Sequence, residues 1–395
     1  MDIGEIAKAP VKGKREPIKR QLTESQLTAI RSIPDHSNPM VPTQEDSRPY
    51  TVYTDPERFL REQASIFEQL PVPVTVSALL PEAGAFVAND IYGVPLLLSR
   101  DRDGKVHAFL NVCRHRGAKI IEGCDPVKAG RVSCPYHAWT YGLKGELVGI
   151  PRQETFPSLR KEDLGLIELT CHEAGGLVWV CLKKGISTPM LEGSDAIDAD
   201  LKALGLDGMS LYGHRTYDLK ANWKLVLEPF MESYHIQRLH RNTVAPLFTD
   251  NANLMDFFGL HSRSVSGRIE FVPSEVDLSS DRLHKTITHA YNLFPNTVIV
   301  TSPYFISVMI VAPHGVDSTV VEYFMLTPEP ADSPKGEDLF ARSYAYQDEI
   351  FREDFGAAVI QQAGLAIGGI DRVHFGGLER QIGPFHTAVE SFADA

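Results

Sequence analysis

Cys113-Arg-His115 and, nineteen residues further on, Cys134-Pro-Tyr-His137 are the stretches that decide how this chain folds. Each stretch offers one thiolate and one imidazole. A zinc finger normally takes its two cysteines from one turn and its two histidines from another. A [2Fe–2S] cluster in which two histidines replace two cysteines needs one Cys and one His from each of two loops. The pattern therefore predicts a histidine-ligated [2Fe–2S] cluster, which is a one-electron carrier.

The alternatives for these four residues are a structural zinc site or a coincidence of placement. The flanking residues favour the cluster. Gly117 and Pro135 stand where two loop tips must turn tightly, and Trp139 supplies an aromatic ring that can shield a cluster. Neutral imidazole ligands leave such a cluster less negative than four thiolates do, so its reduction potential is higher.

With these two loops the chain resembles the Rieske non-heme iron oxygenases, specifically their large (alpha) catalytic subunits. The family usually has Gly where Ala138 stands, a departure of one methyl group that leaves the ligands untouched. The resemblance runs from about Phe59 to Phe392. It implies an α+β fold, in which an all-β Rieske domain precedes a helix-grip (START/Bet v1-like) catalytic domain with an antiparallel sheet.

The hydrophobic pattern changes along the chain in the way that this fold requires. Short apolar runs separated by turns dominate from Pro73 to Val180, and a mixture of helical and strand-like patterns follows from about Leu191. We expect strands over 93–99, 106–111, 297–301, 305–311 and 319–325, and helices over 222–239 and 336–368. The predicted domains are an N-terminal arm and helix packing on the catalytic domain (1–57), the Rieske domain (58–185) and the catalytic domain (186–395).

Composition narrows the possible partners. The 395 residues, 43% of them hydrophobic, suffice for two domains, and a formal charge of −12 argues against nucleic acid. The acidic surface either keeps the protein soluble or faces a basic redox partner.

A basic run without an apolar stretch, from Lys8 to Arg20, is neither a signal peptide nor a membrane segment and is interpreted as a mobile arm. Cys171 and Cys181 are expected to be small buried side chains, and Cys124, between the two ligand pairs, is not expected to be a ligand. Free thiols of this kind fit a reducing cytoplasm.

A second set of candidate ligands follows Asn222-Trp-Lys224, where His235 and His240 stand five residues apart. Five residues turn about 140° beyond one full turn of an ideal helix, so a helix must end or widen before both imidazoles reach one metal. Two histidines alone are weak evidence, and ordinary surface or core histidines are the alternative. The upstream cluster motif adds weight, because a one-electron carrier needs an acceptor.

The resemblance implies that this acceptor is a mononuclear Fe(II) held by His235, His240 and a distant carboxylate. In the family an acidic pair stands eight residues before a Gln that is followed by a small residue, Gly and Leu. The step from Asp354 to Gln362 fits that spacing, which makes Asp354 the expected third ligand and Asp348 the second choice. The other carboxylates considered were Glu349, Glu353 and Asp371.

The resemblance also implies a role for Glu232, three residues before His235. An acidic residue here, often Asp, joins the mononuclear site to a Rieske histidine of a neighbouring subunit, so Glu232 would connect His235 to His137 of the next chain in a homotrimer. Pro229 stands where relatives often have Asn, so no role of that Asn carries over. His374 and His386 are expected to be structural or surface residues.

We therefore expect a cytoplasmic terminal oxygenase that uses O₂ and hydroxylates an aromatic or related apolar compound. The alternative is a monooxygenase that N- or O-demethylates a methylated amine, betaine or methoxy compound; a non-catalytic Rieske electron carrier is the alternative from a different class. The sequence has no Gly-x-Gly-x-x-Gly fingerprint, so electrons from NAD(P)H must come through a separate reductase, with or without a ferredoxin. Residues 230–258, 269–272 and the central strands are expected to line the substrate site.

Overall fold

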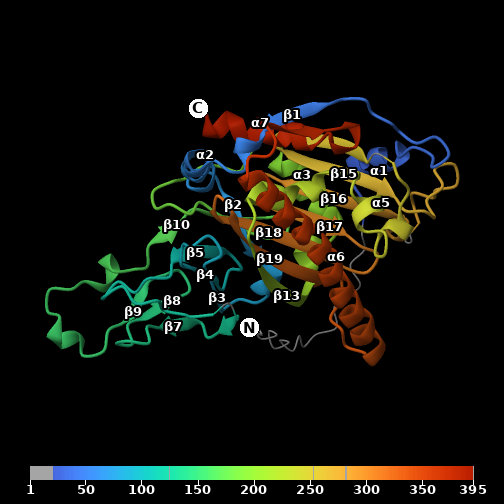
Figure 1. Cartoon of the computed structure of the whole chain (residues 1–395). Coiled ribbons are helices and arrows are strands. Elements are labelled where there is room, and N and C mark those ends of the chain that lie inside the picture. The colour runs from blue at the N-terminus through green and yellow to red at the C-terminus, as the bar shows by residue number, and fades with distance from the viewer. Residues whose placement is uncertain (1–20, 124, 252, 281–282, 395) are drawn as a thin grey trace. The chain divides into compact units, whose positions relative to one another are not determined.

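The computed structural model describes residues 21–123, 125–251, 253–280 and 283–394 (Figure 1). Contacts divide the chain into two compact units, residues 67–190 and residues 1–66 with 191–395. We call them the Rieske unit and the catalytic unit. The basic N-terminal run up to Arg20 and Cys124 lie outside the described residues. Among the residues described, no helix is long and apolar enough to cross a membrane.

The Rieske unit is built from short antiparallel strands. One sheet has the order β10-β5-β4-β3-β6, and two three-stranded sheets have the orders β11-β12-β2 and β7-β8-β9. The strands are β2 Val72–Val76, β3 Ala85–Asn89, β4 Leu96–Arg100, β5 Val106–Leu110, β6 Val127–Lys128, β7 Arg131–Ser133, β8 Thr140–Gly142, β9 Leu147–Gly149, β10 Glu168–Leu169, β11 Cys171–Ala174 and β12 Leu177–Val180. Tight turns join them: Asp101 accepts hydrogen bonds of 2.9 Å from the backbone N–H groups of Asp103 and Lys105. The expected strands 93–99 and 106–111 correspond to β4 and β5.

The catalytic unit has a seven-stranded antiparallel sheet in the order β13-β19-β18-β17-β16-β15-β14. Its strands are β13 Ser210–Leu219, β14 Leu254–Phe258, β15 His261–Gly267, β16 Ile287–Leu293, β17 Thr297–Thr301, β18 Ile306–Gly315 and β19 Ser318–Thr327. The three strand-like runs expected after residue 297 are therefore β17, β18 and β19. These strands are buried along most of their length, which explains their nearly continuous apolar sequence.

A long helix, α6 (Pro334–Ala366), lies against one face of this sheet (Figure 1). Ser333 caps it by accepting a hydrogen bond from the Gly336 N–H, and Pro334 occupies its first turn. Phe351, Phe355 and Ala358 are buried along it. The remaining α-helices within the residues the structure describes are α1 Glu24–Arg31, α2 Pro56–Glu62, α3 Ser194–Ala203, α4 Trp223–Leu227, α5 Ile236–Leu239 and α7 Ile382–Ala393. The α+β fold class is confirmed.

The helical stretch expected over 222–239 is divided into separate short helices. Helix α4 ends at Leu227, a 3₁₀ turn covers Glu228–Met231, and α5 begins only at Ile236. Pro229 has no N–H for the next helical hydrogen bond, and Glu232 is extended at φ −148° and ψ 170°. Helix α5 is itself only four residues long and ends at Leu239, so His240 lies just beyond it at φ −90° and ψ 27°; this end supplies the interruption that the spacing of the two histidines required.

Candidate metal centres

The four residues of the first motif come from two loops of the Rieske unit. Cys113 and His115 follow β5, and Cys134 and His137 lie between β7 and β8. Both cysteines are free and buried, at 2% and 3% exposure. The Nδ1 atoms of His115 and His137 face each other at 3.1 Å. The fold therefore brings these two histidines together across the loops, with both thiols in the core beside them.

Aromatic side chains surround this group. The Trp139 ring stacks on His115 at 4.8 Å, and Phe156 stands edge-on to both rings. The Tyr141 hydroxyl lies 3.4 Å from the Cys113 Sγ and accepts a hydrogen bond from the Arg114 N–H. Burial raises the pKa of the Cys113 thiol, and the contact with Tyr141 offsets part of that rise. Phe156 carried no signal in the sequence, because it comes from a loop beyond the motif.

The departure at Ala138 has a backbone cost. Ala138 adopts φ +55°, the left-handed region that L-residues other than Gly avoid. Its N–H bonds to the Cys134 carbonyl at 2.9 Å and so closes the second ligand loop. The extra methyl group leaves the ligands in place but puts strain into the loop that presents two of them.

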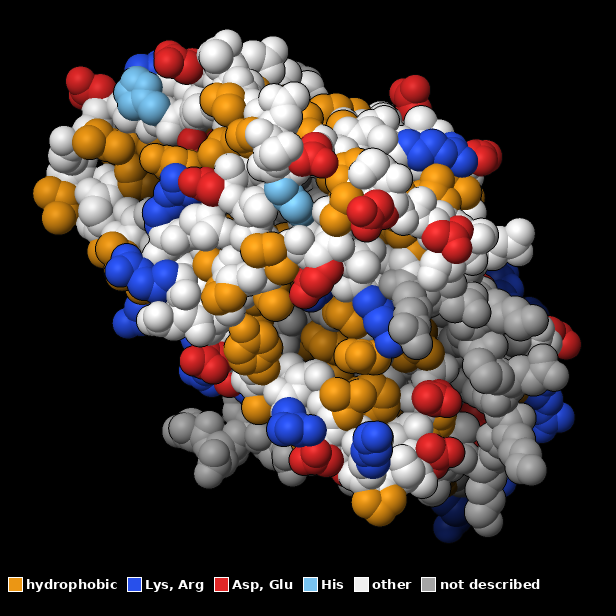
Figure 2. All heavy atoms as spheres, turned by 90° about the vertical axis from the view of Figure 1, so that its right-hand side faces the viewer, with side chains coloured by type: hydrophobic (Ala, Val, Ile, Leu, Met, Phe, Trp, Pro, Cys, Tyr) orange, Lys and Arg blue, Asp and Glu red, His pale blue; other side chains and the backbone are white. Residues whose placement is uncertain are grey.

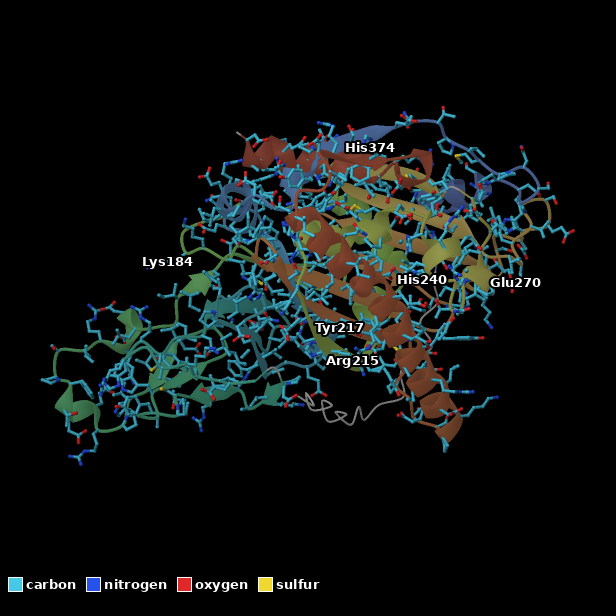
Figure 3. All side chains as sticks on the ribbon, in the orientation of Figure 1. Lys184, Arg215, Tyr217, His240, Glu270 and His374 are labelled. Carbon is cyan, nitrogen blue, oxygen red and sulfur yellow. The ribbon has the colours of Figure 1, made fainter. Side chains whose placement is uncertain are left out.

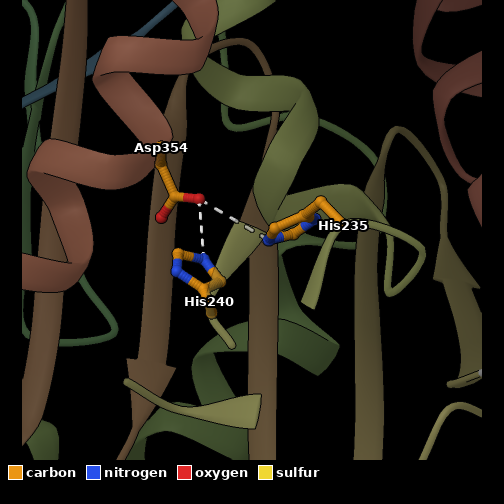
Figure 4. Close-up of side chains that lie close together, drawn as sticks. All are labelled: His235, His240 and Asp354. Carbon is orange, nitrogen blue, oxygen red and sulfur yellow. Dashed lines mark ion pairs between the residues drawn. The ribbon is translucent and has the colours of Figure 1, made fainter. Parts of the chain in front are cut away.

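The second group lies in the catalytic unit, where His235 and His240 at the two ends of α5 turn toward Asp354 of α6 (Figure 4). The His240 Nε2 is 2.9 Å from the Asp354 Oδ1, and the His235 Nε2 is 3.5 Å from the same oxygen. One potential ligand atom of each residue lies within 4.8 Å of the other two. The arrangement offers a metal two imidazoles and one carboxylate.

The donor atoms fit a metal better than they fit one another. Asp354 is 2% exposed, yet its Oδ1 accepts no hydrogen bond from any described residue. This buried carboxylate oxygen has two imidazole nitrogens as its neighbours but makes no well-directed hydrogen bond to either, so the three atoms are placed to share a metal. Two histidines and one carboxylate form the ligand set of non-heme Fe(II) oxygenases, which leaves open positions for O₂ and substrate.

Each histidine also has a carboxylate on its other nitrogen. The Glu232 Oε1 binds the His235 Nδ1, and its Oε2 accepts the His235 backbone N–H at 3.1 Å. The Glu353 Oε2 binds the His240 Nδ1 at 2.6 Å. Burial alone lowers the pKa of His240, but Asp354 and Glu353 outweigh burial and raise it.

The other candidate carboxylates lie elsewhere. Asp348 is paired with Arg215 at 2.6 Å, accepts a 2.7 Å hydrogen bond from the Tyr217 hydroxyl, and contacts Arg352 at 3.0 Å. Arg215 and Tyr217 come from β13 and are labelled beside the lower half of α6 in Figure 3. Glu349 and Asp371 are exposed. The structure thus places Asp354, and not Asp348, with the two histidines.

The Asn222-Trp-Lys224 motif has a structural role. Asn222 caps α4, and its backbone N–H donates to the Gln362 Oε1 of α6 at 2.9 Å. Lys224 and Trp223 both donate to Glu62, which is fully buried. Glu62 lies 161 residues before Trp223, so it could not be recognised as their partner from the sequence.

A second buried group was also not expected. The Tyr53 hydroxyl donates to the Glu228 Oε1 at 2.8 Å, and the His386 Nε2 lies 2.9 Å from the same oxygen. His386 is fully buried, so it is structural, whereas His374 is exposed on β20 (Arg372–Phe375; Figure 3).

Aromatic side chains lie beside Asp354. Phe351, one turn earlier on α6, has Phe230 at 6.1 Å and Tyr323 at 4.9 Å, both edge-on. Ile269 and Val272, which were expected to line the substrate site, are 51% and 39% exposed. The face of the molecule on the side of α1 and α5 shows patches of hydrophobic side chains with charged groups between them (Figure 2).

A cavity of about 80 Å³ lies in the catalytic unit between the sheet and α7. Met231, Asn292, Gln381 and Phe385 line it with eleven other residues, none of which belongs to the His235, His240 and Asp354 group. We therefore do not assign the substrate to this cavity.

Comparison with known families decides the identity. Residues 206–395 match the model of the ring hydroxylating alpha subunit (catalytic domain), and residues 71–160 match the Rieske [2Fe-2S] domain. The chain belongs to the Rieske non-heme iron oxygenases. The predicted enzyme class is confirmed, and so are its two cofactors, a Rieske [2Fe–2S] cluster and a mononuclear iron.

Curated relatives of this Rieske oxygenase include a choline monooxygenase of *Beta vulgaris*, named as chloroplastic, which is 28% identical over 77% of this chain and 68% of its own length. The carnitine monooxygenase oxygenase subunit of *Acinetobacter baumannii* is 24% identical over 75% of this chain and 80% of its own length. These names support the alternative expectation, action on a methylated amine, better than hydroxylation of an aromatic ring.

Solved structures share the fold. A quaternary ammonium Rieske monooxygenase with L-carnitine matches at TM-score 0.73 and 21% identity, covering 91% of this chain and 98% of the other. Naphthalene 1,2-dioxygenase from a Rhodococcus species matches at TM-score 0.69 and 19% identity, covering 88% and 94%. The fold alone therefore does not distinguish the two kinds of substrate.

Proposed function

We propose that this Rieske oxygenase monooxygenates a quaternary ammonium compound at a carbon bonded to the nitrogen. One atom of O₂ enters a C–H bond and the other leaves as water, so that R–H, O₂, two electrons and two protons give R–OH and H₂O. The observation that carries an oxygenase function is the meeting of His235, His240 and Asp354 in a chain with a Rieske domain.

We assign the ligands to the residues that the structure brings together. The cluster ligands are Cys113, His115, Cys134 and His137, and the Fe(II) ligands are His235, His240 and Asp354. When bound, the iron supplies O₂ activation, and the cluster supplies electrons one at a time. The protein holds the imidazoles through Glu232 and Glu353 and keeps Asp354 away from solvent.

The distribution of charge supports a cationic substrate. Residues 67–190 contain fourteen Lys and Arg and thirteen Asp and Glu, a net charge of +1. The whole chain has −12, so the other 271 residues have −13. A strongly acidic catalytic unit raises the local concentration of a cation and accelerates its association, in a manner that salt weakens.

The aromatic side chains beside the metal site support the same class. The π-face of an aromatic ring attracts a quaternary ammonium group. Phe351 lies on α6 three residues before Asp354, so both side chains project from similar sides of the helix. With Phe230 and the buried Tyr323, the buried Phe351 ring forms a cluster on the stretch of α6 that carries Asp354.

Hydroxylation of an aromatic ring is the second candidate. The same three rings and the apolar strands of the sheet would also suit a neutral apolar compound. The two candidate substrates differ in charge. The negative charge of the catalytic unit attracts a quaternary ammonium cation but not a neutral aromatic compound.

A single-turnover experiment distinguishes these candidates without the reductase. The Rieske cluster is reduced with dithionite, excess reductant is removed, and O₂ is added with choline, carnitine or glycine betaine. We expect hydroxylated or dealkylated product, and none from 3,3-dimethylbutanol, the uncharged isostere of choline. Product from naphthalene or benzoate, with none from the quaternary compounds, would overturn the proposal.

Electron delivery is the second part of the proposal. An oxygenase component implies a reductase partner. Within the protein, Glu232 would pass electrons from His137 of a neighbouring subunit to His235, and such a head-to-tail contact closes as a ring, which we propose to be a homotrimer. Both Glu232 oxygens already bind His235, yet each keeps a lone pair for a further donor.

Glu232→Gln tests this route. We expect both metals and the oligomer to be retained, while oxidation of the pre-reduced cluster slows about 10- to 100-fold in stopped-flow with substrate and O₂. An unchanged rate, or a fully active monomer in light scattering, would show that Glu232 is not the connection.

A further inference from the structure

Two neighbouring carboxylates of α6 bind opposite edges of one imidazole. The Glu353 Oε2 lies 2.6 Å from the His240 Nδ1, and the Asp354 Oδ1 lies 2.9 Å from the His240 Nε2. Consecutive residues project about 100° apart around a helix, so the ring fits between them. Glu353 was a candidate ligand in the sequence, but it lies on the edge of the ring that faces away from Asp354.

This contact fixes which nitrogen of His240 is free. An ionised carboxylate only accepts hydrogen bonds, so the His240 Nδ1 must carry the proton that it donates to Glu353. In the neutral form that a metal ligand must have, Nε2 is then the nitrogen with a lone pair, and it is the one directed at Asp354. His240 is 2% exposed, so no bulk water competes for its ring.

Glu353 is itself held in place. The Thr243 hydroxyl donates to the same Oε2 at 2.6 Å, so one oxygen accepts two hydrogen bonds. The Thr243 backbone N–H bonds to the His240 carbonyl at 3.0 Å, which places Thr243 one turn after the histidine. The segment that follows α5 is thereby connected to α6 through Glu353.

We propose that Glu353 is a positioning residue, held by Thr243, that presents the His240 Nε2 to the mononuclear metal. The inference rests on the proposed metal site. Outer carboxylates of this kind orient a histidine ligand and raise its basicity, and their loss typically costs 10- to 100-fold in metal affinity. Glu353 differs from Glu232 in that it binds His240, and its second partner is Thr243, three residues after that histidine.

Binding of Co(II) tests the proposal independently of turnover. The mononuclear metal is removed by chelation, the cluster is left oxidised, and Co(II) binding is measured by equilibrium dialysis and by the electron paramagnetic resonance of the bound ion. We expect Glu353→Ala to weaken Co(II) binding about 10- to 100-fold and to change the resonance, because His240 can then rotate. Glu353→Gln keeps an oxygen that accepts both hydrogen bonds, so its resonance should resemble that of the unaltered protein, with a smaller loss of affinity.

Two further variants complete the set. Glu349→Ala removes the same residue type at an exposed position of α6 and should leave affinity and resonance unchanged. Thr243→Val removes the hydroxyl that holds Glu353 and should weaken binding less than Glu353→Ala does.

The outcomes separate the inference from the proposed site. If Asp354→Ala abolishes Co(II) binding while Glu353→Ala behaves like Glu349→Ala, the metal site stands and the role of Glu353 is wrong. If Asp354→Ala binds Co(II) as tightly as the unaltered protein, the metal site itself is wrong. A lower melting temperature of Glu353→Ala with unchanged affinity and resonance would also overturn the inference, because it shows a purely structural role.

Discussion

The two proposed metal sites differ in how their residues are distributed along the chain. The four residues of the Rieske site lie within residues 113–137, on two loops that short strands hold in place. The mononuclear site joins His235 and His240, at the ends of a four-residue helix, to Asp354 of α6 more than a hundred residues later. A site made by neighbouring loops can be recognised in the sequence as a motif. A site assembled from distant elements cannot, because its ligands come together only when those elements pack. Changes in one unit should therefore affect one site and spare the other.

The largest expected effect is that of Asp354→Ala. A carboxylate ligand has no substitute in a two-histidine remnant, so the mononuclear metal and product formation should be lost, with turnover down at least about 10³-fold. The visible spectrum of the Rieske cluster should be unchanged. Metal analysis, absorption spectroscopy and single-turnover product assays check the three parts.

Asp348→Ala is the matched control, since Asp348 lies on the same helix but pairs with Arg215 and Tyr217. It should keep the mononuclear metal. If Asp348→Ala loses the metal and Asp354→Ala keeps it, the third ligand is misassigned.

The structure explains why spacing along α6 predicted the position of Asp354. Gln362, eight residues later, accepts the backbone N–H of Asn222 at the start of α4. Eight residues turn about 80° beyond two full helical turns, so Asp354 and Gln362 project from adjoining sides of α6, one toward the histidines and the other toward the start of α4. The spacing between Asp354 and Gln362 thus reflects the packing of α6 against α4.

Other features of the site could not be read from the sequence. The break after Met231 depends on Pro229 and on an extended Glu232, and a helical pattern of apolar residues does not reveal either. The partners Glu62 and Thr243 become visible only when distant segments pack together. By contrast, the residues of the Rieske loops, except for Phe156, could be predicted from the sequence, because residues that are close in space there are mostly close in sequence.

The second prediction concerns stability. It compares the loss of a buried ion pair in the catalytic unit with the loss of an exposed ion pair in the Rieske unit. Lys224 donates to both oxygens of Glu62 at 2.7 Å, and both side chains are buried. Glu62→Ala leaves a buried ammonium group unpaired, so the free energy of unfolding should fall by about 3–5 kcal/mol. Denaturant unfolding followed by tryptophan fluorescence measures the loss.

Glu68→Ala is the comparison in the Rieske unit. Glu68 and Lys183 form a pair of 2.7 Å with about half of each side chain exposed, so its loss should cost at most about 1 kcal/mol. Equal losses in the free energy of unfolding for the two variants would show that burial does not determine how much these ion pairs stabilise the protein.

The third prediction concerns pH and the catalytic unit. Burial lowers the pKa of His261 to about 4, below the ordinary value of 6.5. The unfolded chain therefore binds more protons between these two values, so the stabilisation is complete above about pH 6.5 and is lost as pH falls toward 4. The expected loss is on the order of 2–3 kcal/mol, measured by unfolding at pH 7, 5.5 and 4.5.

His261→Gln should flatten this pH dependence while lowering stability at pH 7, because it removes the titrating group together with its contacts to Ser194 and the Phe294 N–H. His374→Gln, at an exposed position, should leave the curve unchanged. A curve of the same slope in His261→Gln would assign the pH dependence to other groups.

The smallest expected effect is a gain, and it belongs to the Rieske unit alone. Ala138 holds φ +55°, which costs an L-residue about 1–2 kcal/mol, whereas glycine adopts it freely. Glycine also has more freedom to lose on folding, which offsets about 0.5–1 kcal/mol, so Ala138→Gly should stabilise the second ligand loop by about 0.5–1 kcal/mol. Thermal loss of the cluster's visible absorbance measures the gain, which should be absent from the loss of the mononuclear metal of the catalytic unit. Ala118→Gly, in the first ligand loop at a residue without positive φ, should lower stability because it adds freedom and removes a methyl group packed on the core. If both glycine variants lower the stability of the cluster, the methyl group of Ala138 contributes more through packing than its backbone conformation costs, and the departure from the family's usual glycine is then an adaptation of this loop.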